Sequence, residues 1–436
     1  MATDNLPPDH ITPYDRFAWS DTLVEEWLAS GERRRELAAY FGTSEYRALA
    51  TLARRAHRVP LNEAMPRVLV VPGIMGSQLG LKRRPPLPHD VLWIDPIDIH
   101  LGRLAWLRVP GGAGIVPLGV VLFSYLRMKL YLRAAGFAVE LHDYDWRLPV
   151  AESGRTLAER LRALRGAPLA IVAHSMGGLV SRAALALPDT RHVERLVLLG
   201  TPNSGSFAAV QALRGTYAVV RKVARLDTSS AESLAAQVFN SFPSLYELLP
   251  HGACAGRFDL FDARCWPADG PQPYGALLRA AREAQQRLAP ADGRFATIAG
   301  VGQETVTAIA RRREDFLYTL TRHGDGTVPV ASAELEGARC AYAHVAHSEL
   351  TRDPVVAAAV VDLLKSGTTA RLPRRWASAS RARARVSDAQ LRRSHLDKVD
   401  WGALTPEQRR LFLENLNEPP RFTLRVPRRA RRPRRR

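Results

Sequence analysis

Residues 171–180 read IVAHSMGGLV, an apolar run that passes through a small-x-Ser-x-Gly turn into a helical pattern. A strand, a tight turn with a central serine and a helix, in that order, predict a nucleophile elbow. The strand and helix backbones approach closely there, so the residues beside the serine must be small. Gly177 meets this demand, and Ala173 adds only a methyl group where glycine is usual. Ser175 is therefore the candidate nucleophile, although a serine at this place can also be a plain helix cap.

The sequence around this turn alternates between buried strands and helices. Short apolar runs predict strands at 67–72, 138–142, 169–173, 196–199, 295–300 and 339–344. Helical periodicity predicts helices at 123–135, 156–165, 176–187 and 354–364. Strands that are apolar on both faces and alternate with helices are typical of a parallel sheet covered by helices. The predicted fold class is α/β.

The chain is expected to have three parts. These are a helical N-terminal extension, an α/β domain and an Arg-rich tail, at residues 1–65, 66–365 and 366–436. We expect the tail to be largely disordered, apart from one helix that begins at Thr405, Pro406 and Glu407, with Thr as the cap and Pro in the first helical position.

An interval at about 207–290 is helical throughout and predicts a cap inserted into the α/β domain. Ser229 and Glu232 have the spacing of a capping box at a helix start. The cap also carries a cluster of apolar aromatic residues at helical spacing, Phe239, Phe242 and Tyr246. Such residues usually pack inward, so a core position is favoured, and a lipid-facing lid surface stays the alternative.

The positive charge of the chain is concentrated in the tail. Of 62 Lys and Arg and 43 Asp and Glu, residues 371–436 contain 20 and 6, which is most of the net charge of +19. The last twelve residues, RVPRRARRPRRR, contain eight Arg and no aromatic residue, so nucleic-acid binding by base stacking has no support. A peripheral contact with an anionic membrane, or a solvated extension, stays open. An apolar content of 46% excludes fully disordered and fibrous classes.

The cysteines and the apolar windows exclude several further classes. Cys254, Cys265 and Cys340 allow at most one disulfide, between the first two, and none has metal-ligand spacing, so we expect no metal and no cofactor. Residues 1–19 hold no apolar run of the kind that opens a secretory signal. The uncharged windows, at 109–126 and 196–213, are interrupted by Pro and Gly and predict no transmembrane helix. A cytoplasmic protein, peripheral to the membrane at most, is expected.

Two later loops supply the partners that a serine nucleophile needs. On this fold an acid and then a histidine follow the serine in the chain. Asp325 lies in GDGTVP, a Gly-flanked loop that can also be a plain tight turn. His347 follows the predicted strand at 339–344. We favour it over His344, because functional residues of such sheets lie in the loops beyond the strand ends.

Backbone donors for an oxyanion are expected beside the nucleophile. The first strand runs into a Gly-rich loop, VPGIMGS at 71–77. Backbone N–H groups of such a loop and of the residue after the nucleophile form the oxyanion hole in this arrangement, which predicts Ile74 and Met176. A plain strand-to-helix turn is the alternative.

Together these motifs resemble the lecithin:cholesterol acyltransferase family, in a bacterial form. The segments that carry the resemblance are AHSMGG around Ser175, GDGTVP around Asp325, HSEL from His347, VLVVPGIMGSQL at 68–79, LWIDP at 92–96, YDWRLP at 144–149 and SFPSLYELLP at 241–250. The resemblance covers about 67–365. It implies an α/β-hydrolase fold and the chemistry of lipid acyltransferases and phospholipases.

The resemblance also implies roles for residues beside the site. Asp145 and Arg147, which flank Trp146, resemble an internal salt bridge that braces the site and does not react. Trp146 is in addition a candidate for the lining of an acyl pocket. The expected function is serine-dependent O-acyltransfer from phospholipid or acylglycerol through an acyl-enzyme. Hydrolysis of the same esters is the alternative, and a catalytically silent hydrolase fold used for binding is the minor one.

Overall fold

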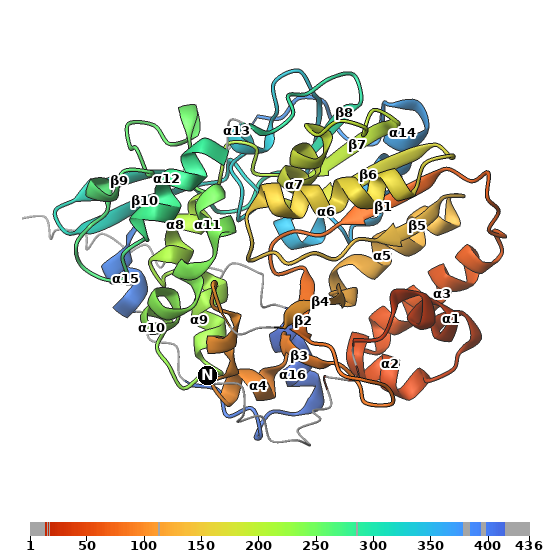
Figure 1. Cartoon of the computed structure of the whole chain (residues 1–436), viewed down its shortest axis with the longest axis horizontal. Coiled ribbons are helices and arrows are strands. Elements are labelled where there is room, and N and C mark those ends of the chain that lie inside the picture. The colour runs from red at the N-terminus through yellow and green to blue at the C-terminus, as the bar shows by residue number, and fades with distance from the viewer. Residues whose placement is uncertain are drawn as a thin grey trace, which may run out of the picture.

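The computed structural model describes Tyr14, Arg16 and residues 18–111, 114–284, 287–377, 384–393 and 398–414. Its centre is a six-stranded sheet with the order β11-β8-β7-β6-β1-β5 (Figure 1). The strands are β1 (Arg67–Val71), β5 (Ala138–Leu141), β6 (Leu169–His174), β7 (Val193–Leu199), β8 (Phe295–Gly300) and β11 (Arg339–Ala343). All neighbours in this sheet pair in parallel. The six predicted strands therefore form one sheet, and the α/β fold class is confirmed.

Helices cover both faces of this sheet because its strands are apolar on both faces. The covering helices are α5 (Leu122–Ala134), α6 (Val150–Ala163), α7 (Met176–Leu185) and α14 (Pro354–Ser366). Leu69 and Val71 of β1 pack in one core cluster with residues of α6 and α7. Val68 and Val70 point the other way, into a cluster with residues of α5 and α14. This alternation along one strand places helices on both sides, as in α/β-hydrolases.

The N-terminal extension is a separate helical layer. Its helices are α1 (Asp21–Ser30), α2 (Arg34–Phe41) and α3 (Thr43–His57). Their apolar residues form a core cluster with Leu122, Leu126 and Leu130 of α5. The layer is also held by charge, since Lys129 of α5 contacts Glu25 at 3.0 Å. The extension is thus packed against the outer side of α5.

The interval expected to be a cap is helical. It contains α8 (Phe207–Leu213), α9 (Ala218–Ala224), α10 (Ala231–Gln237), α11 (Pro243–Glu247) and α12 (Gly275–Ala284), with short 3-10 turns η3 (Phe239–Ser241), η4 (Gly252–Cys254) and η5 (Ala263–Cys265). Phe239, Phe242 and Tyr246 are buried, so they belong to the core and do not form a lid surface. The expected capping box is wrong by one residue, because Ser230 accepts the Ser233 N–H and caps α10.

Two small antiparallel sheets lie outside the main sheet. One has the order β3-β2-β4 and the other β12-β10-β9. Their strands are β2 (Ser77–Leu81), β3 (Asp90–Trp93), β4 (Ile115–Val120), β9 (Thr305–Arg312), β10 (Asp315–Thr321) and β12 (Ala384–Ser387). The remaining short helices are α4 (Pro96–His100), η2 (Arg103–Leu107), α13 (Val330–Ala333) and η7 (His347–Glu349).

The described part of the tail is more ordered than expected. The predicted helix is present as α16 (Pro406–Glu414), but β12 and α15 (Asp388–Arg393) precede it. β12 pairs antiparallel with β10, with Val386 opposite Tyr318. We call residues 384–393 and 398–414 the C-terminal segment. The expectation of a largely disordered tail is wrong for this segment, and the Arg-rich end at 415–436 lies outside the described residues.

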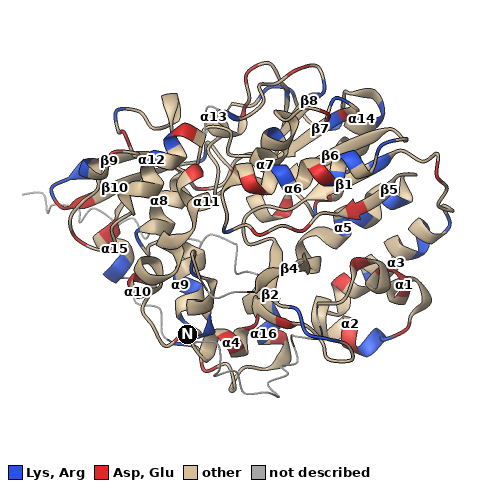
Figure 2. Ribbon diagram, in the orientation of Figure 1, with Lys and Arg blue, Asp and Glu red and all other residues tan. Residues whose placement is uncertain are grey.

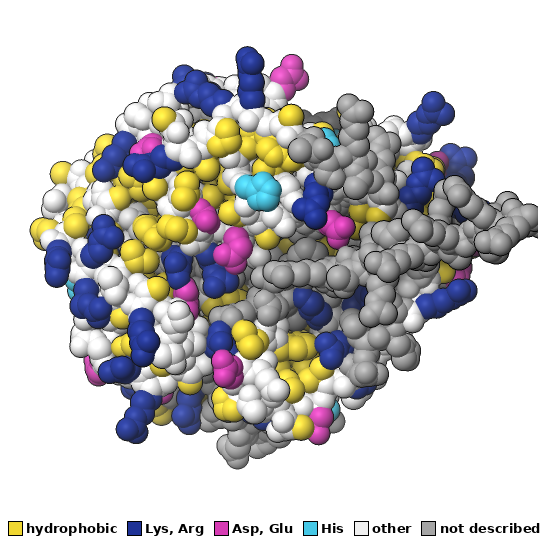
Figure 3. Space-filling view, turned by 180° about the vertical axis from the view of Figure 1, so that it is seen from behind, with side chains coloured by type: hydrophobic (Ala, Val, Ile, Leu, Met, Phe, Trp, Pro, Cys, Tyr) yellow, Lys and Arg dark blue, Asp and Glu magenta, His cyan; other side chains and the backbone are white. Residues whose placement is uncertain are grey.

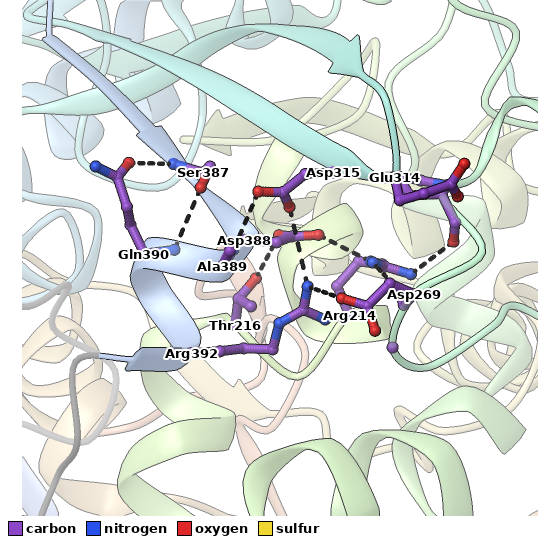
Figure 4. Close-up of polar contacts among 12 residues, drawn as sticks. Arg214, Thr216, Asp269, Glu314, Asp315, Ser387, Asp388, Ala389, Gln390 and Arg392 are labelled. Carbon is purple, nitrogen blue, oxygen red and sulfur yellow. Dashed lines mark hydrogen bonds and ion pairs between the residues drawn. The ribbon is translucent and has the colours of Figure 1, made fainter.

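A buried ion pair fixes the C-terminal segment to the cap (Figure 4). Arg214, directly after α8, donates from Nε to Asp388 Oδ2 at 2.9 Å, and both side chains are fully buried. Asp388 also accepts hydrogen bonds from the hydroxyls of Tyr318, at 2.6 Å, and Thr216, at 3.2 Å. The segment contacts the cap again farther on, where Lys398 Nζ donates to the Ala224 carbonyl at 2.7 Å.

Surface charge on the described body is mixed. Figure 2 shows acidic and basic residues scattered over helices, strands and loops. On the face seen in Figure 3 the basic side chains stand among acidic and apolar ones without gathering in one patch. Among the described residues no helix is long and apolar enough to cross a membrane. Cys254 and Cys265 are free thiols, so the disulfide that the sequence allowed is not formed.

Candidate active site

Ser175 lies in the turn between β6 and α7, with a strained backbone at φ 54° and ψ −129°. Such a conformation costs on the order of 1–3 kcal/mol in a residue with a side chain. The surroundings hold it there, since the Ser175 N–H donates to the Leu199 carbonyl at 2.9 Å. A Cβ on Gly177 would come within 2.4 Å of the Pro72 carbonyl oxygen, so only glycine lets helix and strand approach. The Ser175 side chain makes no capping hydrogen bond, which excludes the plain-cap alternative.

Asp325 and His347 are brought together by loops from two different strands. His347 Nδ1 lies 2.7 Å from Asp325 Oδ2, and the His347 N–H donates to the Asp325 carbonyl at 2.9 Å. The other oxygen of this fully buried carboxylate accepts the N–H groups of Thr327 and Val328, at 2.9 and 2.7 Å. The carboxylate therefore fixes the imidazole on its Nδ1 side and leaves Nε2 for another partner. His344, the competing histidine, is exposed and packs beside Gly302.

Ser175 and His347 line one cavity of about 100 Å³. The loop after β1, helix α5 and the segment after η7 contribute Ile74, Ser124 and Thr351 to its wall. The cap supplies apolar wall residues from α8, α9 and the region of α11, namely Ala208, Ala209, Ala212, Val219, Leu245 and Leu248. Ser175 itself is only 7% exposed. Ser175 is thus nearly buried and faces a largely apolar space that the cap lines on one side.

The expected oxyanion donors lie on either side of Ser175. Ile74 lines the cavity, and its N–H has no acceptor among the described residues. Its neighbour Gly73 donates to the Tyr125 hydroxyl at 2.9 Å, which holds the loop. Met176 is the first residue of α7, where N–H groups have no acceptor within the helix and carry its positive end. Met176 is not among the residues that line the cavity.

The three residues expected beside the site have a structural role. Arg147 donates from Nε and Nη2 to the two oxygens of Asp145, at 2.9 and 2.6 Å, and from Nη1 to the Leu107 carbonyl. Trp146 is fully buried and donates to the Ser77 carbonyl at 3.0 Å. Its ring meets the ring of Phe242 in the cap edge-on, with centroids 5.6 Å apart. Trp146 is not among the residues that line this cavity.

Residues 134–269 match the lecithin:cholesterol acyltransferase family model. The matched segment contains the brace at 145–147, the Ser175 turn and most of the cap, whereas Asp325 and His347 lie outside it. The resemblance expected from the motifs is confirmed over that segment. It supports an esterase-type enzyme that handles the acyl groups of lipid esters.

Several solved structures match the fold of this chain, and bacterial proteins are among them. The mature lipase BlEst2 of Bacillus licheniformis is 16% identical, with 70% of this chain and 94% of that chain covered and a TM-score of 0.38. The Tle4-Tli4 complex gives 14% identity, coverage of 69% and 98%, and a TM-score of 0.47. Phospholipase PlaB of Legionella pneumophila is 11% identical, with 71% of this chain and 60% of that chain covered and a TM-score of 0.33. No curated protein matches the chain.

Three residues of the site were missed by sequence reasoning, namely Tyr125, His174 and Tyr217. All three line the cavity. His174 stands inside the serine motif, but a histidine at the end of a buried strand gives no local sign of its contacts. Burial, with His347 beside it, holds the pKa of His174 well below its ordinary value. Burial also raises the pKa of Tyr217, with the charge of Asp325 acting in the same direction.

Proposed function

We propose that the protein is a serine-dependent O-acyltransferase that takes acyl groups from lipid esters, either phospholipid or acylglycerol. The observation that carries the proposal is the Asp325–His347 pair at 2.7 Å, in one apolar cavity with the strained Ser175 turn. A serine, a histidine oriented by a buried carboxylate and nearby backbone donors are the parts that acyl transfer requires. Among the described residues no group of three potential ligands could hold a metal ion, and the mechanism uses none.

In the first half-reaction Ser175 Oγ attacks the ester carbonyl while His347 Nε2 takes its proton. Asp325 holds the imidazole and stabilises the imidazolium. The N–H groups of Ile74 and Met176 donate to the oxyanion. His347 then gives the proton to the leaving alcohol, and the acyl group stays on Ser175. In the second half-reaction His347 deprotonates an acceptor hydroxyl, which attacks the acyl-enzyme carbonyl to form a new ester. His347 then returns the proton to Ser175 Oγ as the bond from Oγ to the acyl carbon breaks.

The wall of the cavity favours a lipid hydroxyl as acceptor. Its cap side is apolar and Ser175 is nearly buried, so the acyl-enzyme is shielded from bulk water. Hydrolysis is the second candidate because hydroxyl groups also line the cavity. Ser124, Ser348 and Thr351 offer the polar partners that an ordered water needs. The balance between transfer and hydrolysis then depends on how well an acceptor lipid displaces that water.

The test is to incubate the purified protein with acyl-labelled phosphatidylcholine, with and without a long-chain alcohol, and to follow free fatty acid and new ester. We expect new ester when the alcohol is present and none with Ser175→Ala. Free fatty acid alone, unchanged by the alcohol, would replace transfer by hydrolysis. Turnover of short water-soluble esters only would refute the lipid substrate.

A catalytically silent fold is tested by labelling with a fluorophosphonate. The intact protein should label, and Ser175→Ala should not. A folded protein that does not label would end the enzyme proposal, and labelling that survives the substitution would mean that another serine reacts.

For the Arg-rich end, we propose a peripheral contact with anionic phospholipid. Each Arg near such a surface contributes about 1 kcal/mol to binding. The comparison is co-sedimentation with vesicles of phosphatidylserine and phosphatidylcholine for the full chain and for a truncation after Glu414. This end point keeps β12, α15 and α16, which a cut before 384 would remove. Equal binding of the two proteins would contradict the proposal.

A further inference from the structure

His174 connects two parts of the site, the loop of Gly73 and the backbone of His347, which the catalytic roles above leave unconnected. It is the last residue of β6 and is buried. Its ring lies between the rings of Tyr125 and His347, with centroids 5.8 and 4.7 Å away. Both ring nitrogens have a partner, since Nδ1 lies 2.9 Å from the Tyr125 hydroxyl and Nε2 lies 3.1 Å from the His347 carbonyl oxygen.

The partners determine where each proton sits. A carbonyl only accepts, so the proton of His174 is on Nε2 and is donated to the His347 oxygen. The depressed pKa of the buried ring keeps it neutral, so Nδ1 is an acceptor and takes the Tyr125 O–H. The Tyr125 oxygen in turn accepts the Gly73 N–H at 2.9 Å. Each donor in this chain of three hydrogen bonds has one acceptor. The bonds cannot run in the opposite direction, because the Gly73 N–H can only donate and the His347 carbonyl can only accept.

The two ends of this hydrogen-bond chain lie at groups that act in the proposed reaction. At one end Gly73 precedes Ile74, the expected oxyanion donor. At the other end is the backbone of His347, the proposed base. Ser175 lies against the Gly73 end, because a Cβ added to Gly73 would meet Ser175 Cβ at 2.8 Å and His174 Nδ1 at 3.4 Å. A displacement of His174 would therefore shift donor loop and base relative to Ser175.

We infer that His174 is a positioning residue that sets the oxyanion loop and the His347 backbone in register with Ser175, through Tyr125 on one side and its own Nε2–H on the other. The inference rests on the proposed function. Asp325 already orients the His347 ring through Nδ1. His174 acts on the other side of the same residue, and it is the link from that residue to the loop of Gly73.

A neutral His174 also suits the charge that develops during turnover. His347 becomes an imidazolium when it takes the serine proton. A second cation with its ring 4.7 Å away would oppose that charge in a buried site. The Tyr125 bond keeps the Nδ1 lone pair occupied as an acceptor, which disfavours protonation there. Two hydrogen bonds thus hold the ring in place, while burial and the neighbouring His347 keep it uncharged.

Four substitutions separate positioning from simple filling of the core. His174→Phe keeps the ring volume and removes both hydrogen bonds. His174→Gln keeps an amide N–H that can reach the His347 carbonyl. Tyr125→Phe removes the hydroxyl that joins Gly73 to His174. The matched control is His192→Gln, because His192 makes the same kind of bond, Nε2 to the Leu161 carbonyl at 2.9 Å, away from the site.

The readouts are kcat and KM on p-nitrophenyl butyrate, with thermal unfolding of each variant. We expect His174→Phe to lower kcat about 10- to 100-fold, with KM within about twofold, since small misplacements of catalytic groups have effects of that size. His174→Gln should recover part of the loss and His192→Gln should show none. The loss in the double variant of His174→Phe and Tyr125→Phe should be smaller than the product of the two single losses, because the two residues share one hydrogen bond. A folded His174→Phe with unchanged kcat, or losses that multiply in the double variant, would overturn the inference.

If His174→Phe does not fold, the comparison of His174→Gln and Tyr125→Phe decides, and equal kcat to the intact protein in both would overturn the inference. A second measurement does not depend on catalysis. In protein labelled with ¹⁵N-histidine, His174 should carry its proton on Nε2 at neutral pH, and Tyr125→Phe should move the Nδ1 resonance. A proton on Nδ1 would overturn the inference even in an active enzyme. If the protein turns over no ester while the tautomer is as expected, the proposed function fails and the hydrogen-bond chain stands.

Discussion

Replacing Asp388 by Ala should destabilise the protein by about 3 kcal/mol. The carboxylate faces Arg214 at 2.9 Å, with both side chains fully buried. Removal of one member of such a pair costs about 3–5 kcal/mol, because the other charge stays buried without its partner. Arg214 keeps the carbonyls of Pro267, Asp269 and Pro271 as acceptors, and only Nε loses its partner. The hydroxyls of Tyr318 and Thr216 lose the same acceptor, so the loss should reach at least the lower end of the range.

The assay is urea unfolding followed by tryptophan fluorescence and far-UV circular dichroism. Arg392→Ala is the control. Arg392 lies in the same helix, and its closer partner Asp269, at 3.0 Å, has a side chain that is 70% exposed; its other carboxylate partner, Asp315, is 3.9 Å away. An exposed pair of this kind contributes about 0–1 kcal/mol. If Asp388→Ala and Arg392→Ala have the same free energy of unfolding within about 1 kcal/mol, the C-terminal segment is not held by the buried pair and the reasoning is wrong.

Three further predictions concern the body of the enzyme. Burial raises the pKa of Glu247 to about 7, although the hydrogen bond from the Val150 N–H acts in the opposite direction. The folded protein therefore favours the protonated form, and its free energy of unfolding should fall by up to about 3 kcal/mol as the pH rises from about 4.5 to 7. Glu247→Gln should remove that slope in urea unfolding measured across this range, and an unchanged slope would contradict the assignment. Gly177→Ala should abolish fluorophosphonate labelling, because its methyl group would lie 2.4 Å from the Pro72 carbonyl oxygen; labelling at the normal rate would disprove the tight elbow. Ala212→Phe should fill the apolar side of the cavity and shift the preference of kcat/KM toward shorter acyl chains, and an unaltered chain-length profile would show that acyl groups lie elsewhere.

The main sheet and the centre of the site could be predicted because their signals are local. The strands of the sheet are rich in apolar residues, and Ser175 stands in a turn whose small neighbours follow from sterics. The Asp325 and His347 loops are recognisable by their order after that serine. The placement of His347 beyond its strand end is what brings it, and not His344, to the carboxylate.

The C-terminal segment could not be predicted because its order comes from distant contacts. The strand at 384–387 reads ARVS, which has no apolar pattern of its own, and it forms by pairing with β10. Asp388 and Arg214 look like surface charges until the fold buries them together. The same limit applies to Trp146, since its aromatic ring suggested a pocket wall but packs between β2 and the cap.

The C-terminal segment has a consequence for how the enzyme is made. Chains fold as they emerge from the ribosome, N-terminal parts first. Ser175, Asp325 and His347 all precede β12 and α15, so the nascent chain holds every reacting group before Asp388 has been added to cover Arg214. The cap is therefore anchored only after every reacting group has been made. A stalled or prematurely ended chain would release a serine esterase whose cap lacks its buried anchor.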